Sequence, residues 1–301
     1  MTGTAPSSST PDEISNWRNF AFMSGALALC FSLPLYQWAR FAIGHELYSH
    51  LILIPGISVW LVWLQYDRLK ALAGKQLSPA WIMASFSAGL GLLALRWLNP
   101  PAEQDALVMV IFAFLFFFTG TCFRFLNRTI LARMAFPLSF LVLMVPFPVA
   151  VEAGLESILQ HGSAPVAQAI LEAIGTPVFR EGTFFTLPGF KMQLAPECSG
   201  IHSTLSLFIT SLVAGQLLLR SCWSRTVLTL MVVPIALLRN GLRVATIGEL
   251  CVRIGPEMIE SYIHRHGGPI FFVISLVPFS LLLLYLIKID QRKDSLITKK
   301  I

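Results

Sequence analysis

The chain has 301 residues, of which 55% are hydrophobic and only 13% are charged. A soluble domain carries about 25% charged residues, so this composition excludes an ordinary water-soluble fold and indicates a membrane protein. A net charge of +6 is compatible with nucleic-acid binding. However, the positive charge is sorted between the two sides of a membrane, so we expect no nucleic-acid partner.

The first 19 residues are polar and rich in Ser, Thr and Pro. They lack a basic segment that leads into a short apolar core, so they do not resemble a cleavable signal peptide. We predict a disordered cytoplasmic tail over 1–19.

Eight apolar segments are predicted to span the bilayer. The second segment is short and contains Pro55 and Gly56, so we expect a kinked or partly re-entrant helix there. The predicted fold class is an all-α polytopic membrane protein with one transmembrane domain over 20–289. The predicted spans are 20–38, 51–66, 81–98, 106–123, 130–147, 200–219, 226–247 and 269–288.

The distribution of Lys and Arg predicts the orientation of these spans. With the N-terminus inside, 14 of the 22 basic residues fall on the inner side, including those of a basic tail over 290–301. Because cytoplasmic loops carry an excess of Lys and Arg, both termini are predicted to face the cytoplasm. The expected location is the bacterial cytoplasmic (inner) membrane.

The longest predicted outer loop covers 148–199. Its first part has apolar residues at helical spacing and suits one or two amphipathic helices on the membrane surface. Its second part is β-prone and bends around Leu187-Pro188-Gly189, which predicts a short β-hairpin. No internal repeat and no second soluble domain is recognised.

The five cysteines show no paired spacing, so neither a disulfide framework nor a zinc ribbon is predicted. Cys198 differs from the others because it falls where the β-prone segment passes into the sixth span. Exposed N–H groups and the helix dipole favour a thiolate at a helix N-terminus. Gly200 would leave room for a substrate backbone. A buried, inert cysteine is the alternative interpretation.

Arg239, Asn240 and Arg243 lie toward the outer end of the seventh span. Their spacing places all three on one helix face. A guanidinium that keeps its proton suits a thiolate, a substrate carboxylate or a developing oxyanion. Arginines that reach the lipid headgroups are the alternative, and this fits Arg239 well.

His264 and His266 stand at the entry to the last span. A histidine at this boundary exchanges protons near neutral pH, and a thiol nucleophile needs such a group to protonate the leaving amine. Both histidines remain candidates.

His45, Glu46 and His50 resemble a zinc peptidase motif, but the two histidines are five residues apart rather than four. This spacing does not bring both rings to one metal on a helix. We predict no metal and no cofactor.

Taken together, the motifs at 196–200, 240–243 and 48–55, with His264 followed by Gly268, resemble those of the exosortase/archaeosortase family of membrane transpeptidases. The resemblance implies a cysteine protease or transpeptidase with Cys198 as nucleophile, Arg243 as stabiliser and His264 as proton donor and acceptor. His202 departs from the arginine of many relatives.

Family substrates are secreted proteins with a C-terminal motif, a transmembrane helix and a basic tail. The resemblance therefore implies such partners, with cleavage at the periplasmic face through a thioester. Supporting or substrate-binding roles are predicted for Glu197, Ser199, Gly200, Asn240, Arg239, His266 and His50.

Two other functions remain open from the residues alone. One is a transporter in which Arg239, Arg243, Glu249 and His264 line a solute path, although no inverted repeat supports it. The other is a non-catalytic factor for polysaccharide export or assembly. The acceptor, the choice between transfer and hydrolysis, and the oligomeric state are not predicted.

Overall fold

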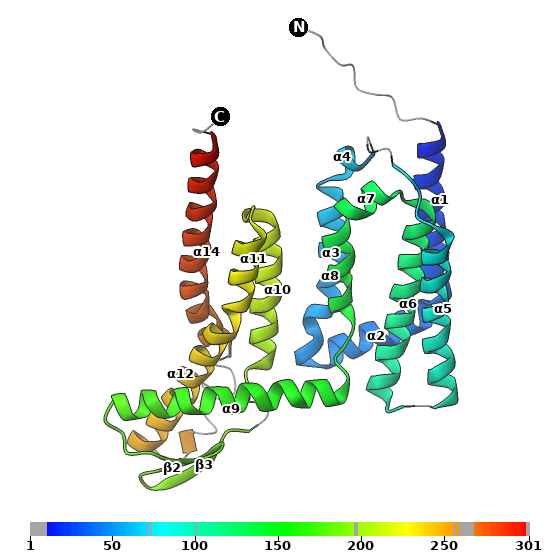
Figure 1. The fold of residues 1–301 in the computed structure, drawn as a ribbon. Helices are drawn as coiled ribbons and strands as arrows, with labels where there is room; N and C mark the ends of the chain where they lie inside the picture. The colour runs from blue at the N-terminus through cyan, green and yellow to red at the C-terminus, as the bar shows by residue number, and fades with distance from the viewer. Residues whose placement is uncertain are drawn as a thin grey trace. The chain divides into compact units, whose positions relative to one another are not determined.

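The computed structural model describes residues 11–70, 72, 74–99, 101–195, 198–255, 257–258 and 268–298. Helices dominate, and the prediction of an all-α polytopic membrane protein is confirmed (Figure 1). In chain order the elements are α1 (Pro11–Cys30), α2 (Ser32–Gly44), η1 (Glu46–Ile52), α3 (Leu53–Trp63), α4 (Tyr66–Lys70), α5 (Pro79–Leu98), α6 (Glu103–Phe125), α7 (Arg128–Arg133), α8 (Ala135–Phe140), η2 (Leu141–Met144), α9 (Val149–Ala173), β1 (Phe179–Glu181), β2 (Phe184–Leu187), β3 (Phe190–Gln193), α10 (Ile201–Leu218), α11 (Cys222–Leu230), α12 (Val232–Arg253) and α14 (Gly268–Thr298).

Six helical segments of the described chain are long and apolar enough to cross a membrane. Two further pairs qualify only as broken spans, which gives up to eight spans, the number predicted. One broken pair joins α1 to α2 with a bend of 71°, and the other joins 135–144 to α9 with a bend of 93°.

The start of the chain differs from its prediction. Residues 11–19 were predicted to be disordered, but they belong to α1, which begins at Pro11. The physical reason is a helix-start signal in a polar sequence, because proline suits the first helical position.

The chain divides into two compact units, Met1–Ala150 and Val151–Ile301. In the first unit, α5 and α6 pack closely because glycines stand at their contact. A Cβ added to Gly89 would lie 3.1 Å from the Phe117 ring, and one added to Gly120 would lie 2.8 Å from Phe86. Small residues allow such close helix approach inside membranes.

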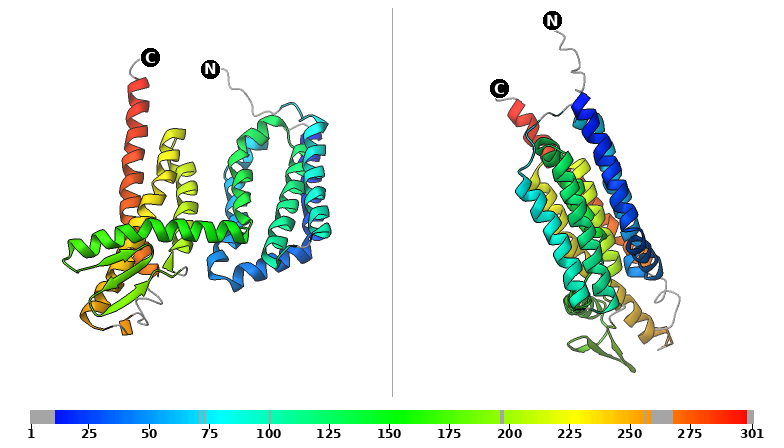
Figure 2. Two further views of the ribbon diagram at one scale, coloured as in Figure 1. Left: turned by 60° about the horizontal axis from the view of Figure 1, so that its bottom comes forward. Right: turned by 90° about the vertical axis from the view of Figure 1, so that its right-hand side faces the viewer.

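In the second unit, α9 crosses the directions of α10 and α14, while α12 passes α9 and continues beside the strands (Figures 1 and 2). One helix, α9, accounts for the first part of the predicted outer loop and continues through Pro165. Its crossing direction is the arrangement expected of a helix that lies along a membrane surface.

The predicted hairpin is present and is part of a three-stranded antiparallel sheet in the order β1-β2-β3. β2 and β3 pair Leu187 with Phe190 across the two-residue turn Pro188-Gly189, where Gly189 has φ 88°. Proline followed by a glycine of positive φ is the sequence of a type II turn.

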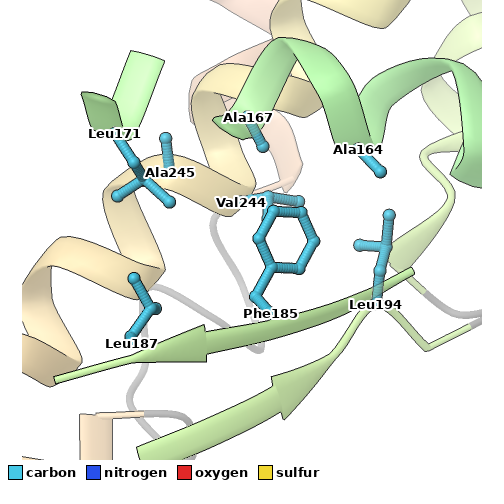
Figure 3. Close-up of a cluster of buried hydrophobic side chains, with 8 residues drawn as sticks. All are labelled: Ala164, Ala167, Leu171, Phe185, Leu187, Leu194, Val244 and Ala245. Atoms are coloured by element: carbon cyan, nitrogen blue, oxygen red, sulfur yellow. The ribbon is translucent and has the colours of Figure 1, made fainter. Parts of the chain in front are cut away.

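The inner face of the sheet packs on α9 and α12 through a buried cluster. Phe185 is fully buried and points from β2 toward the two helices (Figure 3). The cluster consists of Ala164, Ala167, Leu171, Phe185, Leu187, Leu194, Val244 and Ala245.

A buried carboxylate ties the last helix to the turn between α10 and α11. Asp290 of α14 accepts hydrogen bonds from the backbone N–H groups of Arg220 and Ser221, at 3.0 and 3.1 Å, and from Ser224 Oγ at 2.7 Å. It thereby ties α14 to the turn directly before α11 and to the first turn of that helix.

Candidate active site

Cys198 lies in a short turn between the sheet and α10. Its backbone N–H donates to Ala195 O at 2.9 Å, so the chain turns back directly before the helix. The side chain is half-buried and packs against the cluster that Phe185 and Val244 share. A thiol in this position remains partly open to a reactant.

Gly200 begins α10. Its φ of 74° lies in the left-handed region, and its carbonyl oxygen accepts the first helical hydrogen bond, from Thr204 N at 3.0 Å. Residues other than glycine rarely adopt this conformation. The N–H groups of the first turn have no intrahelical acceptor, so they favour negative charge near Cys198.

The predicted helix face on α12 meets this turn. Arg239 and Asn240 are buried, with only 4% and 2% of their surface exposed, whereas Arg243 is half-buried. Arg239 Nη2 donates to Gly200 O at 2.9 Å and to Thr204 Oγ1 at 3.2 Å. Arg239 therefore faces the protein rather than the lipid headgroups.

α9 forms hydrogen bonds both with α12 and with the segment before Cys198. Asn240 Nδ2 donates to Ser163 Oγ at 2.9 Å. Gln160 Nε2 donates to Leu194 O at 3.2 Å, close to the point where the chain leaves β3. Bonds from α9 thus hold both α12 and the segment that leads to Cys198.

Three buried polar atoms around the turn have no hydrogen-bond partner within the described residues. They are Ser199 Oγ, Arg239 Nη1 and Asn240 Oδ1. Unsatisfied buried polar atoms are rare because each one costs free energy, and they concentrate at functional sites.

The structure does not place every predicted site residue beside Cys198. Glu197, His264 and His266 lie outside the described residues. His50 is described, but it lies in η1 of the first unit. His202 is exposed on the first turn of α10.

Within the described ranges, no group of three His, Cys, Asp or Glu side chains is arranged to hold a metal ion. His45 instead forms a hydrogen bond of 2.9 Å between its Nδ1 and Phe41 O. Its ring centroid lies 4.3 Å from that of Phe41. The His45 ring therefore lies against the end of α2.

Sequence reasoning missed Ser163, Thr204 and Gln160. Serine and threonine within apolar helices commonly bond to the carbonyl four residues before, as Thr204 Oγ1 does with Gly200 O at 2.8 Å. Only the contacts with Arg239 and Asn240 distinguish these residues from ordinary helix positions. In the sequence, only the four-residue spacing between Gly200 and Thr204 could have indicated that the Thr204 hydroxyl bonds the Gly200 carbonyl.

A family model described as a transmembrane exosortase matches residues 38–281, which is most of the chain. The chain is a member of the transmembrane exosortase family. The matched range contains Cys198, the face of α12 and the larger part of the last predicted span, and membership supports a membrane transpeptidase role in general. No curated protein and no solved structure matches this exosortase.

We predict that Gly200→Ala disrupts the turn of this exosortase. A Cβ at this position would lie 2.7 Å from Arg239 Nη2 and 3.0 Å from Asn240 Oδ1, in a conformation that alanine disfavours. The expected destabilisation is about 2–4 kcal/mol, measured by thermal unfolding of the purified protein in detergent.

The matched control is Gly215→Ala in the same helix. Its added Cβ would meet Arg225 at an ordinary 3.7 Å. Since alanine is favoured over glycine in a helix interior, stability should hold or rise. Equal losses for the two variants would contradict the close packing at Gly200.

Proposed function

We propose that this exosortase is a cysteine transpeptidase or protease that cleaves the C-terminal sorting signals of secreted proteins. The observation that carries the proposal is the half-buried Cys198, set at the start of α10 beside the arginine and asparagine face of α12. A transporter does not need a thiol in such a turn, and no described contact favours a solute path.

The reaction that this arrangement supports begins with the thiolate of Cys198. Its Sγ attacks the carbonyl carbon of the scissile peptide bond, and negative charge develops on the carbonyl oxygen. Arg243 and the first N–H groups of α10 are the proposed stabilisers of that charge. A guanidinium keeps its proton, so it is suited to this task.

The C–N bond then breaks as the leaving nitrogen takes a proton from the imidazolium of His264. A thioester between Cys198 and the N-terminal fragment remains. An acceptor amine attacks the thioester, its proton passes to the imidazole, and Sγ leaves as a thiolate. Water in place of the amine gives hydrolysis.

Supporting roles are proposed for the residues around the nucleophile. Ser199 and Gly200 shape the turn, Asn240 and Arg239 lie against it, and Glu197 is the residue before Cys198 in the sequence. His266 is a second candidate for the proton donor, and His50 is proposed to contact substrate.

The proposed site of reaction is the outer face of the cytoplasmic membrane, with both termini inside. The excess of Lys and Arg in the predicted inner segments supports this orientation. A substrate whose own helix spans the bilayer would present its cleavage site at that surface. The proposed substrates therefore carry a short motif, a membrane helix and a basic tail.

We predict that Cys198→Ala abolishes processing of a secreted protein with such a C-terminal signal. Cys222→Ala is the matched control because Cys222 is exposed at the start of α11, away from the turn. Processing is followed by the change in substrate mass. Hydroxylamine should release the substrate fragment from a stalled wild-type enzyme, because it cleaves thioesters. Full processing by Cys198→Ala would rule out the thiol mechanism.

The orientation predicts a labelling pattern for two cysteines of the same protein. A membrane-impermeant maleimide should modify Cys198 in intact spheroplasts, whereas Cys222 should react only after permeabilisation. Mass spectrometry of the two cysteine peptides measures each reaction. The reverse pattern would place the nucleophile on the cytoplasmic side and contradict the proposal.

The two histidines are separated by single substitutions. We expect His264→Ala to lower the processing rate more than His266→Ala, because His264 is the proposed proton donor. The loss should be about 100-fold or more, as is usual for general acid–base groups. The opposite ranking would assign the proton transfer to His266.

A further inference from the structure

Arg239 is a buried cation inside a membrane helix. It belongs to the candidate span Cys222–Arg253, and 4% of its surface is exposed. No carboxylate of the described residues forms an ion pair with Arg239. The ion pair described in the same helix joins Arg253 to Glu249. Charged side chains at membrane depth are costly, so such residues usually serve a function.

The main partner of Arg239 is a backbone carbonyl rather than another side chain. Gly200 O accepts from Arg239 Nη2 at 2.9 Å, and it also accepts from Thr204 N, Thr204 Oγ1 and Ser203 Oγ, at 3.0, 2.8 and 3.2 Å. Thr204 Oγ1 accepts a second bond from Arg239 Nη2 at 3.2 Å. The guanidinium and the first turn of α10 are therefore connected at two points.

The turn at Gly200 packs closely against α12, and α12 is in turn bonded to α9. The absent Cβ of Gly200 points at Arg239 Nη2 and Asn240 Oδ1. Asn240 is itself held from α9 by Ser163. Since Cys198 is two residues from Gly200, their Cα atoms are at most about 7 Å apart. The charge of Arg239 thus lies close to the sulfur-bearing residue.

We propose that Arg239 is a positioning residue for the Cys198 nucleophile. Its bond to Gly200 O fixes the turn that presents the thiol at the start of α10, and its charge favours the thiolate. This role rests on the proposed function of Cys198 and is separate from that of Arg243, which is proposed to act on the substrate oxyanion.

The test compares Arg239→Met and Arg239→Lys in the purified full-length protein. The rate of Cys198 alkylation by iodoacetamide is measured across pH, with mass spectrometry of the Cys198 peptide as readout. Arg239→Met should lower the rate at pH 7 about tenfold and raise the midpoint of the pH profile by about one unit. Arg239→Lys keeps the charge and should restore the midpoint, while substrate processing stays reduced because the shorter side chain does not bring its ammonium to the position from which Nη2 bonds Gly200 O and Thr204 Oγ1.

The matched control is Arg225, which holds the other end of α10. Arg225 Nε and Nη2 donate to Leu219 O at 3.0 and 2.8 Å. Arg225→Met should lower the unfolding temperature and leave the midpoint unchanged. An equal midpoint shift for both methionine variants would mean that loosening of α10 alone explains the effect, and this would overturn the proposal.

A second pair of variants keeps the test decisive if Arg239→Met does not fold. Thr204→Val preserves volume but removes the hydroxyl that bonds both Gly200 O and Arg239. Thr210→Val removes a hydroxyl that bonds Ser206 O at 2.8 Å in the same helix, away from the turn. We expect Cys198 alkylation to slow about three- to tenfold for Thr204→Val only. Equal rates in the two variants would also overturn the proposal.

These outcomes can be told apart from a failure of the proposed function. If Cys198→Ala still processes substrate, the thiol mechanism fails whatever Arg239 does. If Cys198→Ala is inactive but Arg239→Met has the wild-type rate, midpoint and processing, Cys198 remains the nucleophile and Arg239 has no positioning role.

Discussion

The hydrogen bond between Arg239 and the carbonyl of Gly200 is the contact around which the second unit is organised. It joins the interior of α12 to the turn that carries Cys198. A buried backbone turn has little water for its polar groups, so the protein must supply the partners. A guanidinium with five donors meets this need and retains its charge.

Close packing behind this bond depends on small residues. A Cβ at Gly241 of α12 would lie 2.6 Å from Val166 of α9, and a Cβ at Gly162 would lie 2.9 Å from Leu237. The two helices therefore approach closely, and Phe185 fills the space that remains beneath the sheet. Van der Waals contact of this kind drives helix association where lipid already surrounds the apolar side chains.

The sequence predicted the membrane class, most spans, the hairpin and the grouping of Arg239 and Asn240, because each rests on hydropathy, helical spacing or turn residues. It did not predict the break between α1 and α2 at Phe31, where the local sequence signal is weak. It also did not predict that α1 begins at Pro11, because the polar composition of this segment favoured disorder. Ser163 and Thr204 were also missed. Their partners come from other helices, and contacts between distant segments have no signature in a single sequence.

The carboxylate of Asp290 has a consequence for how the protein is made. It binds the turn directly before α11 from a helix that is synthesised later, about 70 residues after the backbone groups it binds. The first unit has a buried cluster of its own, around Leu126 and Ile130. During translation, α10 and α11 are therefore made before the carboxylate that binds the turn between them. The N–H groups of Arg220 and Ser221 lack this acceptor until α14 has been synthesised.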